Sequence, residues 1–212
     1  MVTLEFYNYV LSLIGEQPML SSDGDLGSLL ANSVYSSTLA IVQSSRATFF
    51  ERMFTATATN SDYLVPAFSL PNELVQLYSM WLVTLESDLI EMHRQPFQSL
   101  NYGNYYFSYD IIGNDVYFSR NVVRPTDVKL RGLFVPNTKI ADDVVSPIPQ
   151  PAIPAVAHGA ASIMCLSYVD DANAAASHKK ISDELTLLLR QQYGVSRGRN
   201  FNLNPSVGGA FV

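Results

Sequence analysis

The stretch SPIPQPAIP at residues 146–154 separates a predicted β region before it from a predicted helical region after it. It holds four of the eleven prolines, and proline-rich segments form extended, semi-rigid connectors. The sequence that follows predicts two helices, at 155–168 and 172–193, with Asp170 and Asp171 at the break. The last helix has one face rich in apolar residues, and Lys179 and Lys180 point away from it. The residues of this face are His178, Ile181, Leu185, Leu188 and Gln192.

The region before the connector, residues 64–145, predicts short β-strands. Five prolines interrupt it, and no long helix would survive them: Pro66, Pro71, Pro96, Pro125 and Pro136. Side chains alternate from Leu74 to Met80, as in a strand, and a turn at Gly113-Asn114 predicts a hairpin. Strands of this length with turns between them favour a small antiparallel β-sandwich or barrel.

Two further helices are predicted at the N-terminal end. Apolar residues recur at helical spacing from Leu4 to Ile14, and Gly15 is a natural end for this helix. A second apolar stripe predicts a helix from about residue 26 that ends between Phe50 and Phe54.

These elements predict an α+β fold built around four helices. Two N-terminal and two C-terminal helices would form a four-helix bundle from residues 1–60 plus 150–194. A β domain, residues 61–149, is inserted into it, and residues 195–212 form an extended C-terminal tail.

The chain is poor in charge, which points to a surface that other subunits cover. Only 15% of its residues are charged, against roughly 25% in ordinary soluble domains. There are four lysines: Lys129, Lys139, Lys179 and Lys180. Protein interfaces lose lysine and gain aromatic residues, because a hydrated ammonium is unfavourable to bury. A low-lysine habit of the source genome is the alternative explanation.

The two ends of the chain carry opposite charge, within a net charge of −6. No basic residue precedes Arg46, and no acidic residue follows Glu184. An acidic head and a basic tail could complement each other between neighbouring copies, although two separately solvated segments would give the same pattern. The acidic total argues against sequence-specific DNA binding, which depends on basic patches.

The C-terminal tail is too poor in apolar residues to fold alone. Its spaced hydrophobic side chains suit docking on a partner protein. We expect six residues of the tail to bind that partner: Arg197, Arg199, Phe201, Leu203, Val207 and Phe211. A merely frayed terminus is the alternative.

No motif predicts catalysis, a bound metal or a cofactor. His93, His158 and His178 lack metal-ligand spacing, and the single cysteine, Cys165, lies in an apolar helical run that predicts a buried structural thiol. The Asp142-Asp143 and Asp170-Asp171 pairs lack the ligand pattern of a calcium loop and are typical of turns or helix ends. We therefore expect no enzyme.

Two further patterns concern localisation and ligands. A single cysteine suits a reducing compartment, and no window reaches the roughly 20 uninterrupted apolar residues of a membrane helix. Four tyrosines cluster in the predicted β region: Tyr102, Tyr105, Tyr106 and Tyr109. They could bind sugar or stack on nucleic-acid bases, but aromatic residues that alternate along a strand more often form one face of a sheet.

Short motifs along most of the chain resemble one family. LSLIGEQP at 11–18 resembles the start of podovirus tail tubular protein A, the head-to-tail adaptor or gatekeeper. YDIIGNDVY at 109–117 resembles its central β-hairpin, 128–135 the next strand, and 155–192 the paired closing helices. One departure is ATFF at 47–50, where many relatives carry a tryptophan.

The resemblance implies a structural virion protein, a ring of about twelve copies in the neck, assembled in the host cytoplasm. Its partners would be the portal protein above and the tail nozzle below, with tail fibres as a further candidate. DNA would pass through the lumen without sequence-specific binding, and the family contributes no catalytic residue. The alternative is a tail-associated binding module for fibre attachment or carbohydrate recognition, which would use the tyrosine-rich β region.

Overall fold

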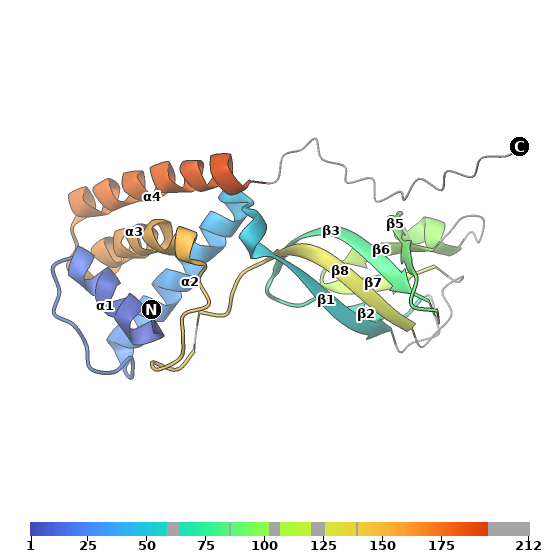
Figure 1. Ribbon diagram of the computed structural model, residues 1–212, viewed down its shortest axis with the longest axis horizontal. Coiled ribbons are helices and arrows are strands. Elements are labelled where there is room, and N and C mark those ends of the chain that lie inside the picture. The colour runs from blue at the N-terminus through green and yellow to red at the C-terminus, as the bar shows by residue number, and fades with distance from the viewer. Residues whose placement is uncertain (59–63, 85, 102–106, 120–125, 139, 195–212) are drawn as a thin grey trace, which may run out of the picture.

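The computed structural model describes residues 1–58, 64–84, 86–101, 107–119, 126–138 and 140–194. The helices gather at one end of an elongated molecule and the strands at the other (Figure 1). The predicted tail, 195–212, lies outside the described residues, and with it all six expected partner-binding residues: Arg197, Arg199, Phe201, Leu203, Val207 and Phe211.

Four α-helices form where the sequence predicts helix. They are α1 (Thr3–Leu13), α2 (Asp25–Ser45), α3 (Ile153–Met164) and α4 (Ala172–Tyr193). The predicted end of the second helix is wrong. Arg46 takes a left-handed conformation with φ of 48°, which ends α2, and β1 begins at Glu51.

Helix α3 is built from small residues that let its neighbours approach closely. Ala155, Ala157, Ala160 and Ala161 are buried, and a Cβ at Gly159 would overlap Ser37 Oγ of α2. Three serine hydroxyls donate hydrogen bonds between helices: Ser37 Oγ to the Val156 carbonyl at 3.0 Å, Ser182 Oγ to Ala155 at 2.9 Å and Ser162 Oγ to Ala175 at 2.9 Å. The helical core is therefore held by close contacts between small side chains and backbone.

The strands form two four-stranded sheets. The first has the order β1 (Glu51–Ala58), β8 (Thr126–Phe134), β3 (Leu74–Val83) and β4 (Leu89–Glu91), all antiparallel. The second has the order β2 (Phe68–Ser69), β7 (Asp115–Phe118), β6 (Ser108–Ile112) and β5 (His93–Arg94). The predicted hairpin is confirmed as the β6–β7 pair, with Gly113 at φ of 63° in its turn.

Two hydrophobic cores stabilise the molecule. The larger lies among the helices and includes Leu133 and Val135, which β8 and the residue after it contribute from the strand region. The second joins the two sheets around Met80, Phe118 and Leu130. Because the end of β8 belongs to the helical core, the two regions are packed against each other there.

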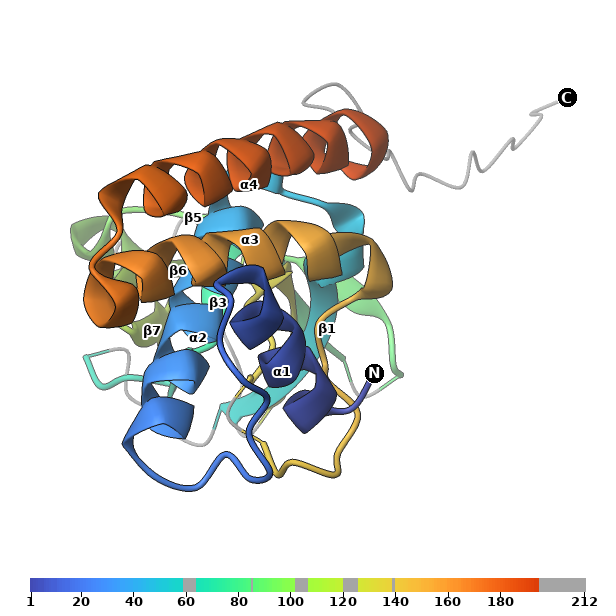
Figure 2. The ribbon, with the colours of Figure 1, turned by 90° about the vertical axis from the view of Figure 1, so that its left-hand side faces the viewer.

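The expected four-helix bundle with an inserted antiparallel β-sandwich or barrel is wrong. α3 and α4 lie side by side, whereas α2 crosses α3 steeply (Figures 1 and 2), and the short α1 packs mainly on α3. Small side chains at the α2–α3 crossing allow this angle, since they form no long ridges that would align the helices. The second sheet is mixed, because β5 runs parallel to β6, and nearby prolines limit β2 and β5 to two residues each.

One helical stretch, Gln150–Val169, is long and apolar enough by length and composition to cross a membrane, with a mean hydropathy of 1.5. Half of this stretch is buried inside the structure, where α3 forms the centre of the helical core. The central helix of a protein core meets the same criteria of length and hydropathy as a membrane-spanning helix, because a protein core and a lipid bilayer both favour apolar side chains.

Candidate interaction surfaces

Helix α4 turns its large apolar side chains away from the protein. The face against α3 consists of small or polar residues and one leucine: Ala175, Ser182, Thr186 and Leu189. On the other side, Ile181, Leu187 and Leu188 are 38%, 54% and 49% exposed. The close approach to α3 favours small side chains between the helices, with Leu189 as the larger one, and Ile181, Leu187 and Leu188 lie outside. We call Lys180, Ile181, Glu184, Leu187 and Leu188 the α4 outer face.

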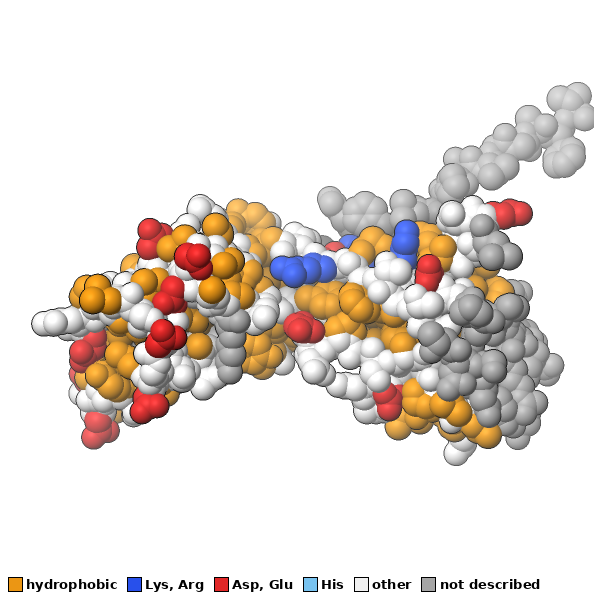
Figure 3. All heavy atoms as spheres, turned by 90° about the horizontal axis from the view of Figure 1, so that it is seen from below, with side chains coloured by type: hydrophobic (Ala, Val, Ile, Leu, Met, Phe, Trp, Pro, Cys, Tyr) orange, Lys and Arg blue, Asp and Glu red, His pale blue; other side chains and the backbone are white. Residues whose placement is uncertain are grey.

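Acidic side chains gather on another side of the helical region. Figure 3 shows this side, viewed from below Figure 1, with Asp and Glu side chains over the helical end. Contacts of the connector after β8 with α1 and with the loop before α2 bring five acidic residues near one another. We call these five residues the acidic face: Glu5, Asp23, Asp25, Asp142 and Asp143.

Asp142 holds the acidic face together. Its Oδ2 accepts a hydrogen bond from the Ser22 backbone N–H at 2.8 Å, and its carbonyl accepts one from the Leu4 N–H at 3.2 Å. Hydrogen bonds from the Ser22 side chain and backbone lower the pKa of Asp142, so the carboxylate is charged at neutral pH. The connector thereby fixes both α1 and the loop before α2.

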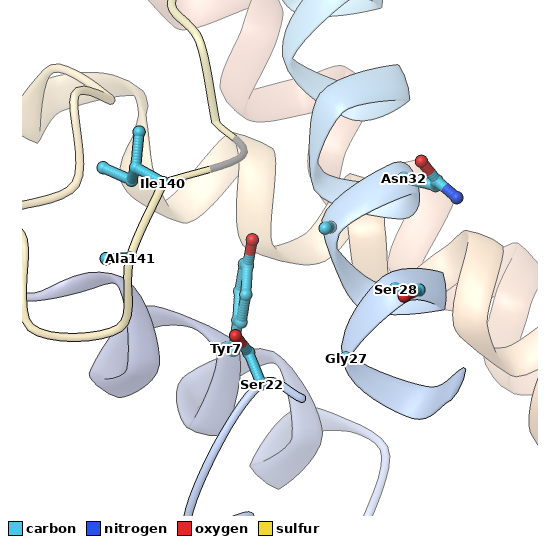
Figure 4. A pocket seen from close by; sticks show the side chains of 8 residues that line it. Tyr7, Ser22, Gly27, Ser28, Asn32, Ile140 and Ala141 are labelled. Atoms are coloured by element: carbon cyan, nitrogen blue, oxygen red, sulfur yellow. The ribbon is translucent and has the colours of Figure 1, made fainter. Parts of the chain in front are cut away.

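A hollow of about 270 Å³ opens beside the acidic face. The Tyr7 side chain points into it between α2 and the connector at Ile140 and Ala141 (Figure 4). Its hydroxyl donates to the Thr138 carbonyl at 3.2 Å, and burial, followed by the charge on Asp142, raises the pKa of Tyr7. The phenol therefore stays neutral and serves as a structural donor.

The turn between α3 and α4 is a second exposed apolar site. A π-helical turn, Cys165–Val169, places Leu166, Tyr168 and Val169 on the surface. Asp170 has φ of 57°, and Asp171 caps α4 by accepting from the N–H groups of Asn173 and Ala174, both at 2.9 Å. The prediction that this acidic pair occupies a helix end is confirmed.

Two histidines that are 20 positions apart in sequence meet in space. His158 Nδ1 of α3 lies 2.9 Å from His178 Nδ1 of α4, and His178 Nε2 lies 3.2 Å from the Leu13 carbonyl at the end of α1. Burial, and then His178, lower the pKa of His158. The sequence analysis missed this pair, although residues equally distant from the turn of a helical hairpin lie opposite each other.

The other candidates for chemistry show no catalytic arrangement. His93 is exposed on β5, and Cys165 is buried, as predicted, with its pKa raised by burial and then by Asp171. Within the described ranges, no three His, Cys, Asp or Glu side chains group to hold a metal ion. Tyr109 is buried in the core between the sheets, and Tyr102, Tyr105 and Tyr106 lie outside the described residues.

No protein-family model matches the chain, and no curated protein matches it.

Proposed function

We propose that the chain is a structural virion protein, a subunit of the head-to-tail adaptor ring of a short-tailed bacteriophage. The ring would link the portal protein to the tail nozzle and enclose part of the DNA channel. The observation that carries this proposal is the α4 outer face, where Ile181, Leu187 and Leu188 lie in solvent on a firmly packed helix. Exposed apolar side chains on a rigid element are typical of surfaces that other proteins cover.

The composition and the sequence resemblance support the same function. Four lysines in 212 residues are few for a protein that works alone in water, but suit one with covered surfaces. The segment at 11–18, which resembles the adaptor family, forms the end of α1 and the loop after it. The histidine pair, the buried thiol and the neutral Tyr7 all act as structural groups, which suits a protein without an active site.

The tail would make the contact with the portal or an adjacent subunit. It begins after Gly194, which pairs with Ala47 beside the edge-to-face contact of the Phe49 and Tyr193 rings. Its origin is thus fixed where the helical and strand regions meet, and its reach of up to about 3.3 Å per residue lets 18 residues span to a neighbour.

Deletion of residues 195–212 tests this role. We expect the shortened chain to keep its helical circular dichroism and thermal midpoint, because the deletion leaves every residue of the two described cores in place. It should no longer load onto portal-containing heads in a pull-down or by negative-stain microscopy. Unchanged loading would contradict the role of the tail, and specific glycan binding by the monomer would favour a binding module instead.

A further inference from the structure

We infer that residues 199–204 of the C-terminal tail add as an outer strand to the first sheet, alongside β1 of the same chain. The inference concerns a single chain and does not depend on the proposed ring. It assigns a site on the described surface to a named segment, and it leaves Val207 and Phe211, beyond the added strand, for a partner.

Strand β1 is an open edge of the first sheet. Its eight residues pair with β8 on one side, and no described strand pairs with it on the other. In Figure 1 it runs below β8 along the lower side of this sheet. The other edge strands, β4, β2 and β5, have only two or three residues each. β1 is therefore the one long edge among the described strands, and such an edge presents unpaired N–H and C=O groups to another strand.

Strand β1 lacks the features that usually keep an open edge from pairing. It contains no lysine, no proline and no register shift against β8. Met53 and Phe54, on opposite faces of the strand, are 58% and 39% exposed. A hollow of about 360 Å³ lies beside the start of β1, where Arg52 and Phe54 border Pro71 and Phe134. An edge with such a hollow beside it suits an extended segment whose alternate side chains are apolar.

The tail contains one segment with this pattern. Residues 199–204 read RNFNLN, in which Phe201 and Leu203 alternate with three asparagines, and Pro205 ends the run. Strict alternation of apolar and polar residues predicts a strand with one apolar face. In the added strand, Phe201 and Leu203 would lie on the face of Phe54 and the hollow, and the asparagines would lie on the other face.

The position of Gly194 makes the tail of the same chain the occupant. Gly194 pairs with Ala47, and β1 begins at Glu51, so at most about 13 Å of chain separates this pair from the start of β1. The five steps from Gly194 to Arg199 reach up to about 17 Å. A segment tethered so closely has a roughly millimolar effective concentration, far above that of a second copy in dilute solution. Since both segments start from this junction, the added strand would run parallel to β1, as β5 does to β6.

Hydrogen exchange at single amides, followed by NMR on the full chain, tests the inference. The β1 amides that face β8 serve as an internal reference, and the outward amides should also be protected, at every protein concentration. Asn202→Pro removes a donor from the middle of the added strand and should abolish the outward protection. Phe201→Ser with Leu203→Ser should do the same by removing its apolar face. Ser206→Pro, just beyond Pro205, is the matched control and should exchange like the wild type.

Unprotected outward amides in the wild type, or protection that survives both Asn202→Pro and the deletion of residues 195–212, would overturn the inference. Protection that rises with concentration would also overturn it, because a second copy would then occupy the edge. An edge strand opens locally without unfolding either core, so the thermal midpoint should stay close to that of the wild type. Exchange is measured on the isolated chain, so its outcome is separate from that of the loading test.

Discussion

His158 and His178 lie with their Nδ1 atoms 2.9 Å apart, so that a hydrogen bond between the two imidazoles joins α3 to α4 in addition to the serine hydrogen bonds. One of these atoms donates and the other accepts, which means that the pair holds one proton between the rings. His178 Nε2 donates its proton to the Leu13 carbonyl at 3.2 Å, which extends the link to α1. Protonation of both rings would break the bond and place two charges side by side.

Acidification should therefore destabilise the helical region. The pKa of His158 is lowered in the folded chain, so the unfolded chain binds the proton more tightly. The stabilisation is complete above the unfolded value of about 6.5 and is lost as pH falls through the folded pKa. We expect the thermal midpoint to fall between pH 7.5 and 5.5 in wild type, and to fall less in His158→Gln. Equal slopes for the two proteins would contradict this.

Gly159→Ala should lower the free energy of unfolding by about 1–3 kcal/mol. The added methyl would overlap Ser37 Oγ, which donates to the Val156 carbonyl in the α2–α3 crossing. Alanine is otherwise the better helix former, so a gain in stability on chemical denaturation would show that the helices lie further apart. The double variant with Ser37→Ala removes the overlapping oxygen and should recover part of the loss.

Asp171→Ala should destabilise the chain by about 1 kcal/mol, because it removes the side-chain cap of α4. Its neighbour supplies the control. Asp170 has φ of 57°, a conformation that asparagine tolerates well, so Asp170→Asn should change the urea midpoint little. Equal effects of the two substitutions would mean that the cap is not formed.

Cys165 should not react with a thiol reagent in the folded chain at neutral pH. The side chain is 1% exposed, and burial raises the pKa of the thiol, so little thiolate forms. In denaturant one thiol per chain should react at once. Rapid reaction under native conditions would instead indicate an accessible, activated cysteine.

Local sequence signals predicted the elements better than their arrangement. Gly15 after α1, the Gly113 turn and Gly194 after α4 all end elements where expected, because each reflects a local backbone requirement. The end of α2 was missed, since Arg46 adopts a left-handed conformation that basic side chains rarely take. The bundle was wrong because the crossing angle depends on the contact of Gly159 with Ser37, and these residues are 122 positions apart.

The candidate surfaces, like the arrangement of the helices, could not be predicted from local sequence signals. Helical spacing correctly placed Ile181 and Leu188 on one face of α4, but an apolar face is ordinarily assigned to the core, and Lys180 was expected to face away from the side that it shares with them. The structure places these residues outside because α4 approaches the alanines and serines of α3 closely and buries mainly small side chains there, with Leu189 as the larger one. The residues of the acidic face are spread over 138 positions, and contacts between distant segments bring them together, among them those of Asp142 with Ser22 and Leu4 and of Val144 with Thr3.

Quantitative mass spectrometry of purified phage particles tests the central claim most directly. The ring predicts this chain in every tailed particle, at a copy number close to that of the portal protein, about twelve. When the tail detaches from a particle, the copies of this chain should either leave together with the nozzle or remain bound to the portal. Complete, infectious particles without this chain would contradict the account.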